Sequence, residues 1–333
     1  IRRCLVGSEM CIRDSLTGIE IGQTHWRIRA NSPSLLECRW SNFDVVAGRD
    51  FLGPYRLVRL IRAGQSSQVW EAIRDPNPKR IAVKVLLPEQ SKNRDEIEQL
   101  RHEAEVGTPL SHSDVIEIYE FNQKHELPFV AMQLFNARNL KQEIRERPAH
   151  VAYHSVEIVR RCADGLGYLH DQGWIHCDIK PDNYLVRDEE VKLIDFSIAQ
   201  KMKKAGFASL LSGFGKSKIR GTRSYMSPEQ IRGQSLGATS DIYSFGCMLF
   251  EIFAHRPPYA GNDPNDLLNR HLRAQPPALS AANNKVTSDF SDLVIRMLSK
   301  DAEKRPQSMT EFMGEFNEVL VYKPGMRPDP PTE

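Results

Sequence analysis

The sequence predicts an α+β protein in two parts, a small antiparallel β-sheet with one main helix followed by a larger, mostly helical part. Short runs of aliphatic and β-branched residues, separated by turn-forming residues, dominate residues 50–135. Helical periodicity dominates residues 139–320. At 333 residues, the chain is long enough for one large two-part domain.

Residues 1–48 precede this pattern and show no sustained periodicity, so we expect an N-terminal extension of uncertain structure. Within it, the stretch SEMCIRDS is similar to translated adapter sequence, which suggests that residues 1–16 are not native. Deleting residues 1–16 should then leave folding and activity unchanged.

The small sheet begins at Tyr55 with three strand-like runs, YRLVRLI, QVWEAI and RIAVKVL. The turn-forming residues DPNP at 75–78 separate the second run from the third, which favours antiparallel pairing. A charged stretch at 93–106 has helical character, and two more strand-like runs follow, VIEIYEF and LPFVAMQLF.

The helical part contains several amphipathic or apolar segments. In SVEIVRRCADGLGYLH the apolar residues repeat at the spacing of one helix face: Val156, Val159, Cys162, Leu166 and Leu169. SDIYSFGCMLFEIF is apolar on nearly all sides, which predicts a helix inside a core. The last helix begins at SMTEF, where Ser308 and Glu311 have capping-box spacing. The Pro-rich tail, residues 321–333, is expected to be disordered.

Composition excludes several classes of protein. The 45 basic and 43 acidic side chains nearly balance, so nothing calls for a nucleic acid or an anionic membrane as partner. The six cysteines form no CxxC pair, which argues against a zinc site or a disulfide framework and favours a reducing, cytoplasmic setting. His102, His112 and His125 lack metal-ligand spacing and are expected at the surface or in caps. No apolar run is long enough to span a membrane.

A polar cluster interrupts the apolar segment WIHCDIKPDNYLV. It places Asp178, Lys180 and Asn183 within six residues, between apolar residues that would hold the segment against a core. Three more polar residues interrupt apolar elements elsewhere: Lys84 in IAVK, Glu103 in RHEA and Asp195 in VKLIDFS. A nucleoside triphosphate requires a cation on its phosphates, oxygen ligands for Mg²⁺ and a base beside the acceptor hydroxyl. These six residues supply each group.

With these motifs, residues from about 53 to 320 resemble the protein kinase family, in particular the eukaryotic-like Ser/Thr kinases of bacteria. The resemblance implies a bilobal fold with an N-lobe at 50–135 and a C-lobe at 139–320. It also implies ATP and Mg²⁺ as cofactors and protein substrates with Ser or Thr acceptors. It implies nothing about the oligomeric state.

The resemblance also implies individual roles. Asp178 would accept the proton of the substrate hydroxyl, and Lys180 would neutralise the γ-phosphate. Lys84 would hold the α- and β-phosphates and pair with Glu103. The Mg²⁺ ligands would be Asn183 and Asp195. The nucleotide would further contact Gly64, Val69, Ala82, Gln133, Phe135 and Leu185.

Four residues further along the chain match the part of the kinase domain that binds protein substrates. Thr222, in GTRSYMSPEQ, would contact the catalytic loop from the substrate-docking segment. Glu229 would form an interior ion pair with Arg305 of EKRP. Asp241, in SDIYSFG, would cap the backbone of the catalytic loop.

The chain departs from the family pattern at four positions. Arg62 and Ser67 stand at two of the three glycine positions of the phosphate-covering loop, so only Gly64 remains. Cys177 replaces the arginine of the HRD motif, which implies a non-RD kinase, and is expected to pack as a small buried thiol. Ser197 replaces the glycine of DFG, and its β-carbon should hinder reversal of that segment.

Three functions follow from these observations. The first is an active Ser/Thr protein kinase. The second is a pseudokinase that serves as a nucleotide-binding or protein-interaction module, which the four departures favour. The third is a small-molecule phosphotransferase, which SPEQ, Asp241 and Arg305 disfavour. The basic segment between Asp195 and Glu229 fits either a solvated loop or a dock for acidic partners.

Overall fold

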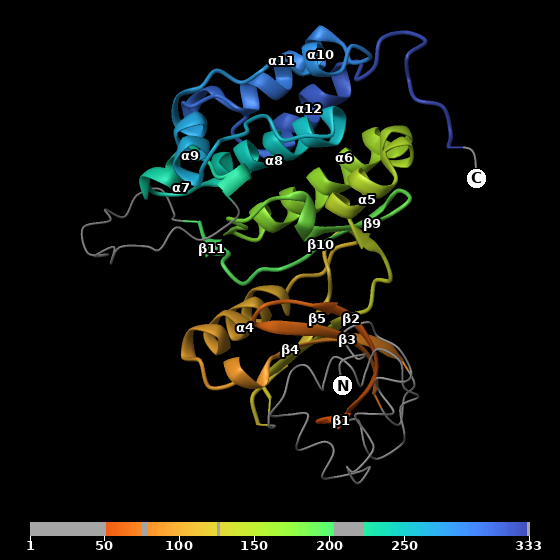
Figure 1. Cartoon of the computed structure of the whole chain (residues 1–333), viewed down its shortest axis with the longest axis vertical. Coiled ribbons are helices and arrows are strands. Elements are labelled where there is room, and N and C mark those ends of the chain that lie inside the picture. The colour runs from red at the N-terminus through yellow and green to blue at the C-terminus, as the bar shows by residue number, and fades with distance from the viewer. Residues whose placement is uncertain (1–50, 75–78, 125–126, 203–222, 332–333) are drawn as a thin grey trace. The chain divides into compact units, whose positions relative to one another are not determined.

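The computed structural model describes residues 51–74, 79–124, 127–202 and 223–331 (Figure 1). The expectations for residues 1–48 and for Thr222 lie outside the described residues. The chain forms two compact units. Among the described residues, the first contains those up to Pro109 together with Ile116–Phe135, and the second contains Leu110–Val115 and those from Asn136 onward. Their content of sheet and helices confirms the α+β prediction.

The first unit is built on a six-stranded antiparallel sheet with strand order β1-β2-β3-β4-β6-β5. Its strands are β1 (Phe51–Leu52), β2 (Tyr55–Ala63), β3 (Ser67–Arg74), β4 (Arg80–Leu86), β5 (Ile118–Asn122) and β6 (Phe129–Gln133). All five strand-like runs of the sequence are therefore confirmed. Alternate residues of the strands point into one core, where Trp70, Val83 and Phe129 are fully buried.

One main helix, α4 (Arg94–Gly107), packs against β5 and β6 of this sheet (Figure 1). A short 3₁₀ helix, η2 (Pro88–Gln90), precedes it. The side chain of Asn93 caps α4 by accepting a hydrogen bond from Asp95 N at 3.1 Å. The helix lies one residue later at each end than the sequence predicts, and it buries the side chain of Glu103.

The second unit is organised around two long helices, α6 (Pro148–Asp171) and α8 (Ala238–Ala254). Every residue of α8 from Ser240 to Phe253 is buried, which confirms that this helix lies inside a core. It packs against α6, α7 (Pro228–Arg232), α10 (Leu279–Ala282) and α11 (Ser288–Met297) (Figure 1). The remaining helices are α5 (Leu140–Glu146), α9 (Pro264–Arg273) and α12 (Met309–Glu318).

Short strands and turns of the second unit carry the polar cluster. The strands are β7 (Arg138–Asn139), β8 (Trp174–Ile175), β9 (Tyr184–Arg187), β10 (Glu190–Leu193) and β11 (Gln200–Lys201). β9 pairs with β10 and with β7, and β8 pairs with β11, all antiparallel. The 3₁₀ turns are η3 (Pro181–Asn183), η4 (Arg223–Tyr225) and η5 (Ala302–Lys304). Among the described residues, no helix has the length and apolarity that a membrane crossing requires.

Two details differ from the sequence prediction. Val156 is only half-buried, because the neighbouring Ser155 and Ile158 face the core of the second unit instead. The expected disorder of the tail is wrong at its start. Val321 is buried, and Tyr322 forms a β-bridge with Val286.

Candidate active site

In the first unit, a buried ion pair joins β4 to α4. Lys84 lies between Val69 on β3 and Val130 on β6 in the sheet register. Its Nζ is 2.6 Å from Oε2 of Glu103, a residue that is only 2% exposed. A carboxylate this deeply buried requires a cationic partner, so the pair holds the lysine ammonium at a fixed place on the sheet. Such an ammonium can bind phosphate oxygens.

Around the β2–β3 turn, Gly64 stands at one of the three expected glycine positions, and Arg62 and Ser67 stand at the other two. Gly64 N donates to Ser67 O at 2.9 Å, and a β-carbon on Gly64 would lie 3.0 Å from that same oxygen. Arg62 is paired with Val69 inside the sheet. Neither Arg62 nor Ser67 adopts a positive φ, so no backbone strain penalises their side chains.

In the second unit, three side chains of the segment 176–183 converge. Lys180 Nζ lies 2.6 Å from Asp178 Oδ2. The amide nitrogen of Asn183 donates to Asp178 O at 2.8 Å and to Oδ2 at 3.2 Å. These donors orient the carboxylate and place a positive charge beside it. The arrangement can accept a proton from a hydroxyl and can neutralise an anion at the same place.

Asp241, a buried residue of α8, holds the backbone that leads into this cluster. It accepts hydrogen bonds from His176 N at 2.7 Å and from Cys177 N at 2.9 Å. The cap implied by the resemblance is therefore present. His170 Nε2 is also 2.9 Å from Asp241, and Gln230 Nε2 donates to Cys177 O at 2.7 Å. Sequence reasoning missed His170 and Gln230, because no local pattern marks a side chain that contacts a distant backbone group.

Cys177 has a left-handed backbone with φ of 67°, which is rare for a residue with a β-carbon. Asp241 and Gln230 bind both polar groups of its backbone and so stabilise this conformation. The thiol is buried, and burial raises its pKa far above the ordinary value. It packs as the small apolar group that the sequence predicts.

His176 connects the catalytic loop to the segment that contains Asp195. Its Nδ1 accepts from Asp178 N at 3.3 Å, so its Nε2 carries the hydrogen and donates to Ile194 O at 3.2 Å. Ile194 N in turn donates to Asn183 O at 3.0 Å. Asn183 and Asp195 therefore lie on adjacent segments, at the two ends of the β9–β10 hairpin.

Asn183 and Asp195 fit a hard divalent cation. The amide nitrogen of Asn183 is engaged by Asp178, so the oxygen Oδ1 is the atom that Asn183 can offer to a cation. Asp195 adds a carboxylate from a left-handed backbone position, with φ of 68°. Mg²⁺ prefers oxygen ligands of these types. Ser197 lies outside the left-handed region, so its β-carbon adds no strain there.

Glu229 and Arg305 form the interior ion pair implied by the resemblance. Arg305 Nη1 is 2.6 Å and Nη2 is 3.1 Å from the two carboxylate oxygens. The same guanidinium donates to Thr239 O at 2.7 Å and to Ser299 O at 2.8 Å. Arg305 therefore joins α7, the start of α8 and the loop after α11.

The residues expected to contact adenine occur in both units. Val69, Ala82, Gln133 and Phe135 belong to the first unit, and Leu185 on β9 belongs to the second. Ala82 is buried and pairs with Met132 of β6. The adenine contacts remain predictions. His112 lies in a turn outside the helices, where its Nδ1 accepts a hydrogen bond from Asp114 N at 3.1 Å.

Comparison with known proteins agrees with this geometry. Residues 55–316 match the family model described as the protein kinase domain. PknB, a serine/threonine-protein kinase of Mycobacterium tuberculosis, is 29% identical over 82% of this chain and 44% of its own length. A probable serine/threonine-protein kinase of Streptomyces coelicolor, SCO3848, is 28% identical over 82% of this chain and 41% of its own length. The chain spans less than half the length of these curated relatives.

A solved structure shows the same fold. The kinase domain of PknI from Mycobacterium tuberculosis superposes with a TM-score of 0.60 at 23% identity, over 84% of this chain and 98% of that domain. The family model covers most of the chain, from the second strand of the sheet to the last helix. The chain belongs to the protein kinase family.

Proposed function

We propose that this chain is an ATP-dependent protein kinase that phosphorylates Ser or Thr residues and is of the non-RD type. The Asp178–Lys180–Asn183 cluster carries the proposal, because it combines a base, a cation and a metal ligand within hydrogen-bonding distance. The matched relatives are named serine/threonine-protein kinases, which supports the proposed activity. The kinase domain would occupy residues 50–320, with lobes at 50–135 and 139–320.

In this proposal Asp178 accepts the proton of the attacking hydroxyl, and Lys180 neutralises the developing charge on the γ-phosphate. Asn183 and Asp195 hold Mg²⁺ through their oxygens. When bound, the ion neutralises phosphate charge and orients the leaving group. The acceleration comes from positioning and charge, because the transition state of phosphoryl transfer is loose.

Nucleotide binding would begin at Lys84, which Glu103 holds in place for the α- and β-phosphates. Gly64 would cover the phosphates through its backbone. The adenine ring would be held by Val69, Ala82, Leu185 and the backbone of Gln133 and Phe135. We propose Thr222 as a substrate-docking residue, protein substrates as partners and a cytoplasmic setting.

The decisive experiment replaces Asp178 by Asn. The change keeps the shape of the side chain and its ability to accept from Lys180, but it removes the base. We expect loss of phosphoryl transfer to protein by at least about 100-fold, with Mg·ATP still raising the thermal midpoint of the variant. Autophosphorylation retained at the wild-type rate would contradict the role of Asp178.

The same assays distinguish the pseudokinase alternative, which rests on Arg62, Ser67, Cys177 and Ser197. A pseudokinase would bind Mg·ATP and raise the thermal midpoint, yet the wild type would not transfer phosphate. The four departures do not strain the backbone. Three of them lie outside the left-handed region, and hydrogen bonds support the fourth, Cys177.

A further inference from the structure

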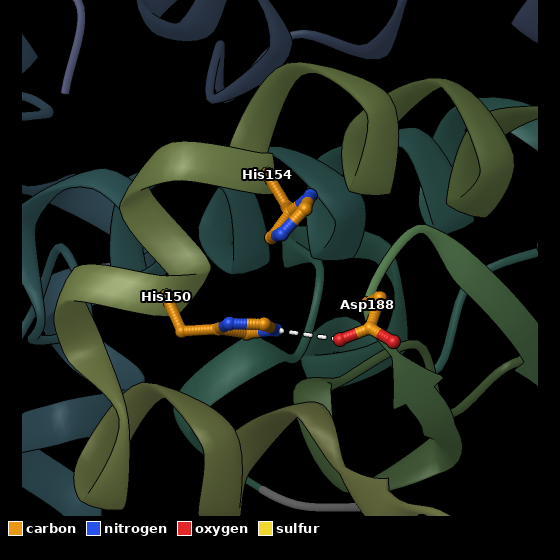
Figure 2. Close-up of side chains that lie close together, drawn as sticks. All are labelled: His150, His154 and Asp188. Carbon is orange, nitrogen blue, oxygen red and sulfur yellow. Dashed lines mark ion pairs between the residues drawn. The ribbon is translucent and has the colours of Figure 1, made fainter. Parts of the chain in front are cut away.

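A cluster of two histidines and one aspartate lies outside the residues proposed for catalysis (Figure 2). His150 and His154 occupy successive turns of α6, and Asp188 lies in the turn between β9 and β10. One ligand atom from each of the three residues lies within 4.8 Å of the other two. A carboxylate oxygen of the next residue, Glu189, is 3.3 Å from His154 Nδ1.

The second observation concerns His150. The residue is 8% exposed, and its Nε2 is a buried atom without a hydrogen-bond partner. That nitrogen points toward Asp188 (Figure 2), whose Oδ1 lies 3.3 Å away. A buried imidazole nitrogen ordinarily makes a well-aligned hydrogen bond. The Nε2 of His150 has a carboxylate oxygen beside it but no aligned hydrogen bond, and a metal ion bound by both atoms would satisfy it. An ion would bind where one ligand atom from each of the three residues can reach it, since these atoms all lie within 4.8 Å of one another.

We propose that His150, His154 and Asp188 bind a divalent transition-metal ion, with Zn²⁺ as the ion that this ligand set fits best. Two imidazole nitrogens and one carboxylate oxygen are common Zn²⁺ ligands, and water or Glu189 would complete the coordination. Two histidines spaced i and i+4 on one helix face present their rings to the same ion. Mg²⁺ is a poor alternative because it prefers oxygen ligands.

Arg147 opposes binding in the metal-free protein. Its Nη2 lies 3.1 Å from His150 Nδ1, and a guanidinium can only donate. Nδ1 therefore accepts, and the ring hydrogen resides on Nε2, the nitrogen that faces Asp188. A metal requires the lone pair of Nε2, so binding moves that hydrogen to Nδ1 and displaces Arg147. The Arg147 side chain is 49% exposed, so Nη2 can move away from the ring while Nη1 stays near Glu143 Oε2, 3.4 Å away.

The bound ion would cross-link the β9–β10 turn to α6. This hairpin begins directly after Asn183 and ends two residues before Asp195. The metal would thus brace the element that connects the two proposed Mg²⁺ ligands, without contacting the reacting groups. Its role would be structural or regulatory.

The test measures Zn²⁺ binding to the whole chain by calorimetry in excess Mg²⁺, which saturates oxygen-only sites. Asp188→Asn is the cleanest variant, because the side chain is 68% exposed and Asn tolerates the positive φ of this position, 54°. We expect Asp188→Asn and His154→Ala each to weaken one Zn²⁺ site by at least about tenfold. The control His112→Ala removes a histidine that also lies beside an aspartate, and it should bind Zn²⁺ like the wild type.

A further variant tests the position of the ring hydrogen. Arg147→Gln removes the charge and offers His150 Nδ1 a hydrogen-bond acceptor, so this variant should bind Zn²⁺ several-fold more tightly than the wild type. Co²⁺ in place of Zn²⁺ should give the visible absorption of a nitrogen- and oxygen-coordinated ion, and Asp188→Asn should lose it. Equal Zn²⁺ affinity and stoichiometry in the wild type, Asp188→Asn and His154→Ala would overturn the proposal. These measurements are independent of phosphoryl transfer and of the function proposed above.

Discussion

Replacing Arg305 by Met should destabilise the protein severely. The Arg305 side chain is fully buried and makes four hydrogen bonds, two to Glu229 and one each to Thr239 O and Ser299 O. Its guanidinium carbon also lies 4.9 Å from the centre of the Tyr243 ring. Met has a similar length, so it keeps most of the packing and removes the charge. Glu229 would then be a buried carboxylate without a cation.

Breaking a buried ion pair by removing one partner costs about 3–5 kcal/mol in the free energy of unfolding. In a protein of this size, we expect the thermal midpoint to fall by roughly 10 °C. Urea denaturation followed by fluorescence measures the free energy directly, and calorimetry measures the midpoint. The double variant Glu229→Leu with Arg305→Met should be less destabilised than the sum of the single variants, because no charge remains buried.

A matched control is available on the surface. Arg270→Met removes an exposed guanidinium whose Nε lies 3.2 Å from Asp266 on the same helix, α9. Such exposed pairs contribute little to stability, because water and salt screen them. A loss of unfolding free energy in Arg305→Met no larger than that in Arg270→Met would show that the buried pair of Arg305 and Glu229 contributes no more than an exposed one.

Three other predictions can be checked with similar methods. Burial lowers the pKa of His271 to about 4, so the unfolded chain binds more protons between that value and about 6.5. The contribution of neutral His271 to the free energy of unfolding should be present above about pH 6.5, and the free energy should be lower by about 2 kcal/mol at pH 5. In acid denaturation curves, His271→Asn should show a smaller decrease. Gly165→Ala would place a β-carbon 2.8 Å from Asp114 O and should cost about 1–3 kcal/mol, whereas Gly314→Ala, with nothing within 4 Å, should be neutral or stabilising; equal effects in urea denaturation would contradict the clash. Lys84→Met should lower kcat/KM for ATP by at least about 100-fold, and a loss below about tenfold would argue against its phosphate role.

Much of the fold could be predicted because backbone preferences are local. The runs around Tyr55, Trp70 and Val83 have the composition of half-buried strands, and all three became strands of one sheet. The apolar character of the α8 segment on all sides predicted its burial. Within the candidate site, the proximity of Asp178, Lys180 and Asn183 was also predictable, since a segment of six residues cannot separate them far.

Other contacts could not be predicted from local patterns. Gln230 reaches the backbone of Cys177 across 53 residues of chain, and nothing around Gln230 marks it as a partner. The tail near Tyr322 has the composition of a disordered segment, yet the Tyr322 hydroxyl lies 2.8 Å from Ser155 Oγ and donates to Ala152 O at 3.1 Å. Composition describes the average behaviour of a segment, whereas specific contacts with a helix such as α6 can order it.

The i and i+4 spacing of His150 and His154 is visible in the sequence, but the third ligand is not. Asp188 lies 34 residues after His154 in the chain and reaches the helix through the β9–β10 turn. Periodicity and spacing along the chain specify which elements form and which face of each is apolar, because these depend on short-range sterics and on burial. Packing alone specifies the partner of a buried charge or of a buried imidazole, because those partners belong to elements that only the folded chain brings together.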